Sequence, residues 1–361
     1  MNKEKAKNIR NILLLIGMTI LVLYFVMKDN FSSIMYELSQ ANLWWIALGV
    51  FLFYLGLYFK SLAFSGIIRE FEPKFSLFET IRIQLATQFF NGITPFATGG
   101  QPLVGVWLTK KGVDGPSSVN IVIQDFITYQ TGLVLLGVYA VLYNFFFHMF
   151  PSDSLLKKLV TLGFIMNTLV IVLLYLVSLN PKFNKMVTGW IVKFLDKINV
   201  VKDKEKTIKK WEDYVDRFSA GATSLFKNKK LFVRSIILNM LYLSSQYLVP
   251  LAIAYSLGIN TFGINECIIS SAYSMLIGAF VPIPGATGGL EYAFLQFFGN
   301  FIKDAALLSA LMILWRAITY YSAMIVGAIA LYVKKDKQWE LVYLQIHIHH
   351  MLMVFLHPYR C

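Results

Sequence analysis

Six stretches of this chain are long and apolar enough to cross a lipid bilayer as helices. A membrane-spanning helix needs about 20 mainly apolar residues, and it satisfies its own backbone hydrogen bonds in hydrocarbon. Apolar residues make up 57% of the chain and charged residues 15%, which excludes a soluble enzyme, a disordered chain and a repeat solenoid. The sequence predicts an all-α polytopic membrane protein with spans at about residues 9–27, 42–64, 118–147, 156–179, 231–257 and 304–333.

Two further apolar stretches, at about residues 77–108 and 265–300, are interrupted by proline and glycine near their middles. Proline removes a backbone donor and glycine is a weak helix former. A continuous helix is therefore not expected through residues 94–102 or 282–289, and we predict two broken or re-entrant helices.

The placement of Lys and Arg predicts the orientation, because short cytoplasmic loops are enriched in both. The basic regions are the N-terminal tail, residues 65–82, Lys110–Lys111, residues 181–230 and the end of the last span. Loops 28–41, 148–155 and 258–266 lack this excess, so both termini are predicted to be cytoplasmic. A cysteine in 148–155 is expected to label from outside, and one in 200–210 from inside.

The N-terminal apolar run lacks a signal-peptide cleavage site and is expected to be retained.

The two interruptions share a motif. Pro95-Phe-Ala-Thr-Gly-Gly100 and Pro284-Gly-Ala-Thr-Gly-Gly289 agree at five of six positions, and the predicted orientation has them enter from opposite sides. This pattern indicates an inverted repeat, and secondary transporters place substrate sites where such segments meet. Helix N-termini favour anions and glycine permits close approach, so a phosphate is the expected guest, and bulk at Gly100 or Gly289 is expected to intrude on it. The alternative is that both motifs only kink structural helices.

Ionisable residues inside apolar segments need a partner or a wet cavity. We expect Arg316 to contact the phosphate, with Tyr320 on the same helix face and Glu291 as its counter-charge. The alternative for Asp125 and Arg316 is a structural or interfacial ion pair. The candidate lipid-binding residues are Asn91, Thr94, Pro95, Gly99, Gly100, Gln101, Gln124, Asp125, Tyr129, Pro282, Pro284, Gly285, Gly288, Gly289, Glu291, Arg316 and Tyr320.

These segments resemble a known family. Residues 91–103, residues 282–291 and Leu314-Trp-Arg-Ala-Ile-Thr-Tyr-Tyr321 are similar to signatures of the lysylphosphatidylglycerol synthase transmembrane (flippase-like) family, over about residues 10–335. The resemblance implies movement of anionic or aminoacylated phospholipid, such as lysyl-phosphatidylglycerol, between leaflets of a bacterial cell membrane. It also implies resistance to cationic antimicrobial peptides. Full-length synthases add a cytosolic domain that transfers lysine from lysyl-tRNA to phosphatidylglycerol.

Two departures from the family pattern affect the functional expectation. Only 24 residues follow Lys337, too few for that transferase domain, and Gln101-Pro102 stands where many relatives carry an acidic residue. We therefore expect a lipid translocase with no catalytic residue and no cofactor, partnered by anionic phospholipid. The alternatives are a phosphatidylglycerol lysyltransferase, or its membrane subunit working with a separate aminoacyltransferase, and a small-solute secondary transporter. A homo-oligomer is a further open expectation.

The sequence predicts two parts of the chain, a membrane domain at residues 1–335 and a C-terminal tail at residues 336–361. Within the domain, residues 181–230 hold thirteen Lys or Arg against six Asp or Glu. We expect a basic cytoplasmic linker, or an amphipathic helix pair on anionic lipid, and no nucleic-acid binding. The tail holds four of the five His, for which an interfacial helix is favoured over a metal site. Cys267 and Cys361 suggest neither a zinc site nor a disulfide.

Overall fold

The computed structural model describes residues 31–150, 155–180, 226–278, 281 and 283–332, together with isolated positions between 182 and 190. The described part is built from helices and turns and contains no strand. Five helical stretches in it are long and apolar enough to cross a membrane: Leu43–Phe71, Gly115–Phe147, Lys158–Leu176, Lys229–Ser256 and Ala305–Leu331. The chain is an all-α polytopic membrane protein, as the sequence predicts. The expected span at 9–27, most of the basic segment and the tail lie outside the described residues.

Three predicted spans correspond to single long helices. They are α3 (Leu43–Phe71), α6 (Gly115–Phe147) and α7 (Leu155–Leu179). The first two begin at capping side chains, because Asn42 accepts a hydrogen bond from the Trp44 N–H and Asp114 accepts one from the Ser117 N–H. A short helix that the sequence did not predict, α2 (Phe31–Gln40), precedes α3.

The predicted span at 231–257 is broken into α10 (Lys229–Tyr247) and α11 (Val249–Ser256). Pro250 follows the break and has no N–H to donate. The Leu251 N–H, which would bond to the Tyr247 carbonyl in an unbroken helix, donates to the Leu248 carbonyl at 3.1 Å. The Tyr247 carbonyl accepts hydrogen bonds from the Cys267 Sγ, at 3.1 Å, and the Ser271 Oγ, at 3.0 Å. Side chains of a neighbouring helix, α12 (Ile264–Gly278), therefore satisfy the backbone that the break exposes.

The last predicted span is also interrupted. It consists of α14 (Ala305–Arg316), a π-helical turn, η3 (Ala317–Tyr321), and α15 (Ser322–Tyr332). Such π turns within helices are frequent at functional sites, and this one directly follows Arg316.

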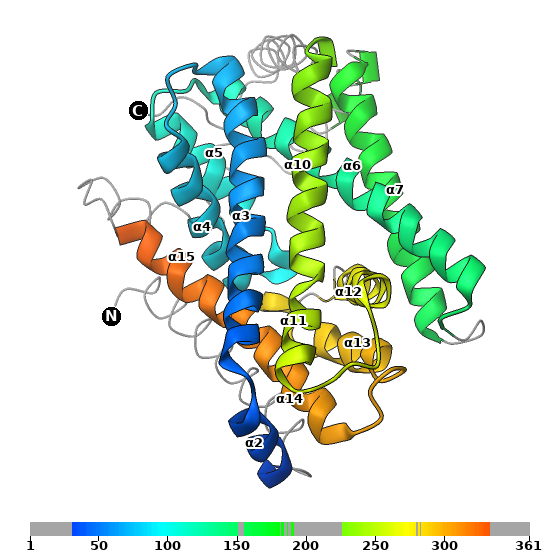
Figure 1. Cartoon of the computed structure of the whole chain (residues 1–361). Coiled ribbons are helices and arrows are strands. Elements are labelled where there is room, and N and C mark those ends of the chain that lie inside the picture. Colours follow the sequence, from blue (N-terminus) through cyan, green and yellow to red (C-terminus); the bar gives the residue numbers. More distant parts are fainter. Residues whose placement is uncertain are drawn as a thin grey trace, which may run out of the picture.

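The two broken segments each fold into a helical hairpin. The first consists of α4 (Leu77–Ile93), η1 (Pro95–Ala97) and α5 (Gly100–Lys110). The second consists of α12, η2 (Pro284–Ala286) and α13 (Gly289–Phe298). In Figure 1, α4 and α5 lie toward one end of the bundle and α13 toward the other, and the tips η1 and η2 are in contact. The predicted inverted pair of re-entrant segments is therefore present.

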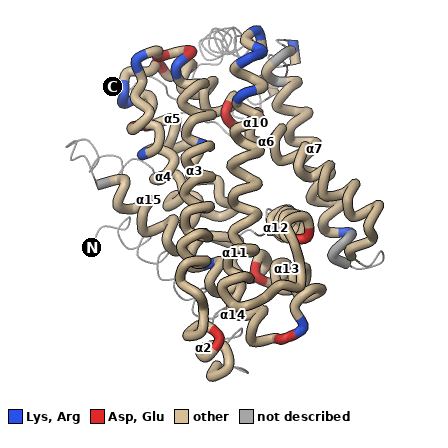
Figure 2. Tube along the Cα trace, viewed as in Figure 1, with Lys and Arg blue, Asp and Glu red and all other residues tan. Residues whose placement is uncertain are grey.

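Charge is distributed unequally between the two ends of the bundle. Figure 2 shows Lys and Arg gathered at the end where α3 and α5 finish and α10 begins. The first hairpin enters from this basic end, and the second enters from the opposite end.

Helix α15 packs closely along α4, with a glycine at the contact. A Cβ at Gly327 would lie 2.6 Å from the Leu85 carbonyl oxygen and 3.0 Å from the Phe89 nitrogen. At the far end of this contact, the Arg82 Nε donates to the Ala330 carbonyl at 2.9 Å. Small residues at helix contacts permit this close backbone approach in membranes.

We predict that Gly327→Ala destabilises the protein, because the added methyl group meets backbone atoms that cannot rotate away. The expected loss is about 1–3 kcal/mol, visible as a lower midpoint of thermal unfolding in detergent. Gly105→Ala in α5 is the matched control, since a Cβ there meets no atom within 4 Å. Equal midpoints for the two variants would contradict the close contact.

Candidate functional site at the tips of the two hairpins

The two copies of the motif adopt the same backbone over their first half. The residues before each proline, Thr94 and Ile283, have φ and ψ of −110° and 145°, and of −110° and 143°. Phe96 and Gly285 follow with φ of 54° and 65°, and the alanines after them are also left-handed, at 51° and 53°. Left-handed backbone is strained in residues other than glycine. Both copies therefore share an unusual turn.

The copies diverge at the first of their paired glycines. Gly99 has a φ of −72°, which any residue adopts, whereas Gly288 has a φ of +90°, which favours glycine. A Cβ at Gly288 would meet no atom within 4 Å. The backbone of the second tip therefore faces open space at this position.

The first tip is closed by its own side chains. The Gly99 N–H donates to the Thr94 Oγ1, and the Gly100 N–H donates to the Asn91 Oδ1, both at 2.8 Å. Asn91 and Thr94, predicted to bind lipid, thus satisfy backbone donors at the start of α5. Beside them, Gln101 has a buried Oε1 without a hydrogen-bond partner among the described residues.

The second tip contains the predicted ion pair. The Arg316 Nη2 lies 2.7 Å from the Glu291 Oε1, and both side chains are buried. The same nitrogen donates to the Gly285 carbonyl at 3.1 Å, while the Glu291 Oε2 accepts from the Gly288 N–H at 2.7 Å. Pro284 opens η2, and Pro282 lies outside the described residues. The structure confirms that Glu291 is the counter-charge of Arg316.

Tyr320 joins the two tips. Its hydroxyl donates to the Gly92 carbonyl at the end of α4, at 3.0 Å. Its ring occupies the space next to Gly285, where a Cβ would lie 2.5 Å from ring atoms. The Arg316 guanidinium carbon is 5.1 Å from the ring centroid, within cation–π range. Arg316 and Tyr320 therefore share a face, as predicted.

The structure corrects the expectation for the second glycine of each motif. A Cβ at Gly100 would lie 2.5 Å from the Asn91 Oδ1 and still closer to Thr87, and one at Gly289 would meet the Val281 side chain. Both glycines lie in helices and pack against the chain itself. A side chain at Gly100 would first meet Asn91 and Thr87 on α4, and one at Gly289 would first meet Val281, between α12 and η2.

The structure divides the predicted site in two, because Asp125 belongs to a separate cluster on α3, α6 and α10. The Lys60 Nζ contacts the two Asp125 carboxylate oxygens at 2.8 and 2.9 Å and lies 5.1 Å from the centroid of the Tyr129 ring. The Gln124 Nε2 donates to the Asn120 Oδ1, further along α6. Sequence reasoning missed Lys60, although a lone lysine in an apolar span was a usable signal.

A third buried polar cluster, also missed, lies at the basic end. Glu79 accepts a hydrogen bond from the Trp107 Nε1 at 2.8 Å and pairs with Lys111 and Arg82. Because Arg82 also donates to the carbonyls of Ala330 and Leu331, this cluster ties α4, α5 and α15 together.

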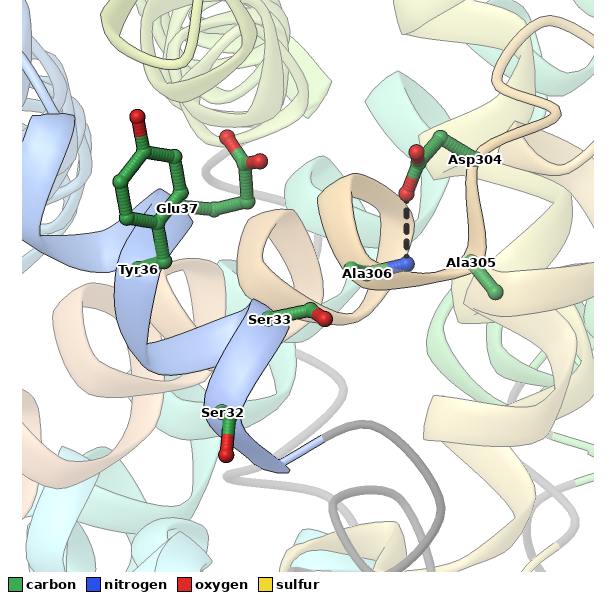
Figure 3. Close-up of a pocket in the computed structure, with 7 residues that line it drawn as sticks. All are labelled: Ser32, Ser33, Tyr36, Glu37, Asp304, Ala305 and Ala306. Atoms are coloured by element: carbon green, nitrogen blue, oxygen red, sulfur yellow. Dashed lines mark hydrogen bonds between the residues drawn. The ribbon is translucent and has the colours of Figure 1, made fainter.

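Figure 3 shows a shallow pocket at the opposite end, between α2 and α14. Its lining includes Glu37 and Asp304, and the Asp304 Oδ1 accepts from the Ala306 N–H. No motif residue lines this pocket. Within the described residues, no group of three His, Cys, Asp or Glu side chains is placed to hold a metal ion.

A known protein family matches the part of this chain that contains both motif copies and Arg316. Residues 11–327 match the model of the Lysylphosphatidylglycerol synthase TM region. The chain belongs to this family. A UPF0104 membrane protein of Archaeoglobus fulgidus is also similar, with 26% identity over 270 residues that cover 71% of this chain and 76% of that protein. The resemblance seen in the sequence is confirmed.

We predict that Tyr320→Phe destabilises this family member by about 1–3 kcal/mol, because the buried Gly92 carbonyl loses its donor while the ring remains. The measurement is the thermal unfolding midpoint in detergent. Tyr292→Phe is the control, since Tyr292 is 53% exposed. A midpoint for Tyr320→Phe equal to that of the control would show that this hydrogen bond does not hold the tips together.

Proposed function

We propose that the protein binds the head group of an anionic or aminoacylated phospholipid where the two tips meet, and that it moves the lipid between leaflets. The observation that carries the proposal is the buried Arg316 guanidinium at this meeting point. Membership of the lysylphosphatidylglycerol synthase TM region family supports the same substrate class.

Arg316 has an incomplete set of partners. The residue is 5% exposed, and its Nη2 contacts Glu291 and Gly285. Its Nε has no hydrogen-bond partner among the residues that the structure describes. A buried donor without a partner is destabilising by about 1–3 kcal/mol. Phosphate oxygens are strong acceptors for guanidinium groups, so a phosphate oxygen at Nε would complete the site.

The ion pair also fits a head group that carries both charges. Arg316 provides a positive group for the phosphate, and Glu291 provides a negative group for an aminoacyl ammonium. The buried Gln101 Oε1 offers an acceptor on the first tip, and open space at Gly288 provides access to the second. This complementarity favours an aminoacylated phospholipid over a simple inorganic anion.

The hairpin arrangement supports movement of lipid as well as binding. Hairpins that enter from opposite ends and meet at their tips provide the two access routes that alternating access requires.

The basic end faces the cytoplasm in our proposal, because Lys and Arg favour the inner side, and both termini then lie in the cytoplasm. Anionic phospholipid is the proposed partner; a separate aminoacyltransferase and self-association remain compatible with the proposal.

We predict that Arg316→Gln slows lipid movement at least tenfold, since a charge-assisted hydrogen bond contributes about 1.5–3 kcal/mol. The measurement is the movement of fluorescent phosphatidylglycerol and lysyl-phosphatidylglycerol in proteoliposomes. Arg69→Gln is the control, because Arg69 lies at the basic end and contacts the Phe75 carbonyl.

Removing Arg316 alone leaves Glu291 buried without its cation, which is strongly destabilising. The double variant Arg316→Gln, Glu291→Gln removes both charges and is expected to fold while remaining inactive. Normal lipid movement by this folded double variant would refute the proposed function.

The proposed orientation is tested by cysteine labelling in intact cells, in a chain with Cys267→Ala and Cys361→Ser. Lys74 and Lys303 are both exposed. Lys74 lies between the end of α3 and the start of α4, at the basic end, and Lys303 lies between α13 and α14, at the other end. We predict that Lys303→Cys reacts with an impermeant maleimide directly and that Lys74→Cys reacts only after permeabilisation. The reverse pattern would invert the assignment.

A further inference from the structure

The Lys60–Asp125 pair lies deep within the helix bundle. Asp125 and Asn239 each lie ten residues from the starts of their helices, at Gly115 and Lys229, and Lys60 lies eleven residues before the end of α3. At a rise of 1.5 Å per residue, all three lie about 15 Å from the basic end. The pair is therefore enclosed among apolar helices, about three turns from the basic end, and a charge within an apolar span is destabilising and usually functional.

The two partners depend on each other unequally. Besides Asp125, the Lys60 ammonium has the Asn239 Oδ1 at 3.1 Å and the Tyr129 ring. Asn239 is itself held in place through its Nδ2 by Thr128 and the Ser235 carbonyl. Both Asp125 oxygens, in contrast, are bonded to the single Lys60 ammonium, and the described residues show no second donor to them.

This inequality determines what happens if α3 moves relative to α6. Lys60 would keep Asn239 and Tyr129, but an ionised Asp125 would remain in hydrocarbon without a cation. Uptake of a proton removes that charge. The titratable groups that face Asp125 are Lys60 on α3, Tyr129 on α6 and Tyr242 on α10. Its side chain is 17% exposed.

Glu291 differs from Asp125 in this respect. Its two oxygens have separate donors, Arg316 and the Gly288 N–H. The Gly288 donor lies three residues away on the same tip and moves with Glu291, so the carboxylate keeps a hydrogen bond if Arg316 moves. Of the two carboxylates, Asp125 is therefore the one whose charge depends on a single contact between helices.

We propose that Asp125 is the proton-binding group that couples lipid movement to the transmembrane proton gradient. The carboxylate is ionised while α3 and α6 are paired through Lys60. It takes one proton from water on one side when the helices separate, and it returns that proton to the other side when the pair re-forms. This inference rests on the proposed function and names its source of energy.

The first test measures lipid movement in proteoliposomes with and without an imposed pH gradient. Wild-type protein is expected to move lipid several-fold faster with the gradient, whereas Asp125→Asn moves lipid at one rate in both conditions. The double variant Lys60→Met, Asp125→Asn provides the same comparison if the single variant does not fold. Glu37→Gln is the control, since Glu37 lies at the opposite end, on α2. The proposal would be overturned if the wild-type rate of lipid movement were the same with and without the gradient, or if the Asp125→Asn variant moved lipid faster with it.

The second test does not depend on lipid movement. Infrared difference spectra of the full-length protein, recorded across a pH titration, are expected to show a protonated carboxyl band in wild type and in Glu37→Gln. That band is expected to be missing in the double variant. If wild type moves no lipid but Asp125 titrates, the proposed function fails and Asp125 remains a proton-binding group. If no band depends on Asp125, the coupling proposal fails even when lipid moves.

Discussion

In hydrocarbon no water is present to bond with a free backbone group, so every interruption of a membrane helix must be closed by the protein itself. This requirement accounts for most of the buried polar side chains near the breaks. Thr94 accepts the Gly99 N–H, Glu291 accepts the Gly288 N–H, and Tyr320 donates to the Gly92 carbonyl. Ser271 closes the break between α10 and α11 in the same way. The polar groups of the candidate site are therefore also the groups that make two re-entrant hairpins stable.

The two halves of the inverted repeat share the backbone conformation of their tips but differ in the side chains that contact those tips. Both tips begin with the same left-handed turn, but only the second has an ion pair in contact with it. The first tip is closed by Asn91 and Thr94. The second contacts Arg316, whose Nε has no hydrogen-bond partner in the described part of the chain. In the proposed function, charge recognition therefore resides in the second half of the repeat, and the first half supplies Gly92 and Gln101 as neutral neighbours.

The Arg316–Glu291 and Lys60–Asp125 ion pairs differ in how many further partners each charged group has. Arg316 and Glu291 each have a further partner at the second tip, which fixes both charged groups of the proposed binding site in place. Lys60 and Asp125 join α3 to α6, and only Lys60 has further partners. A contact of this kind depends on the relative position of two helices. We therefore propose that the first site recognises a charged head group and that the second responds to relative movement of α3 and α6.

The sequence by itself determined the features that depend on nearby residues. The length of the apolar stretches defined the spans, proline and glycine marked both tips, and the spacing of Arg316 and Tyr320 placed them on one face. Only the tertiary structure decided which helix faces meet. It paired Asp125 with Lys60, 65 residues away, turned Gly100 and Gly289 toward the chain's own side chains, and inserted a π-helical turn after Arg316. The pairing of Lys60 with Asp125 arises from contact between distant helices, and the surroundings of Gly100 and Gly289 arise from how each hairpin folds back on itself. Local periodicity and composition carry no information on either kind of contact.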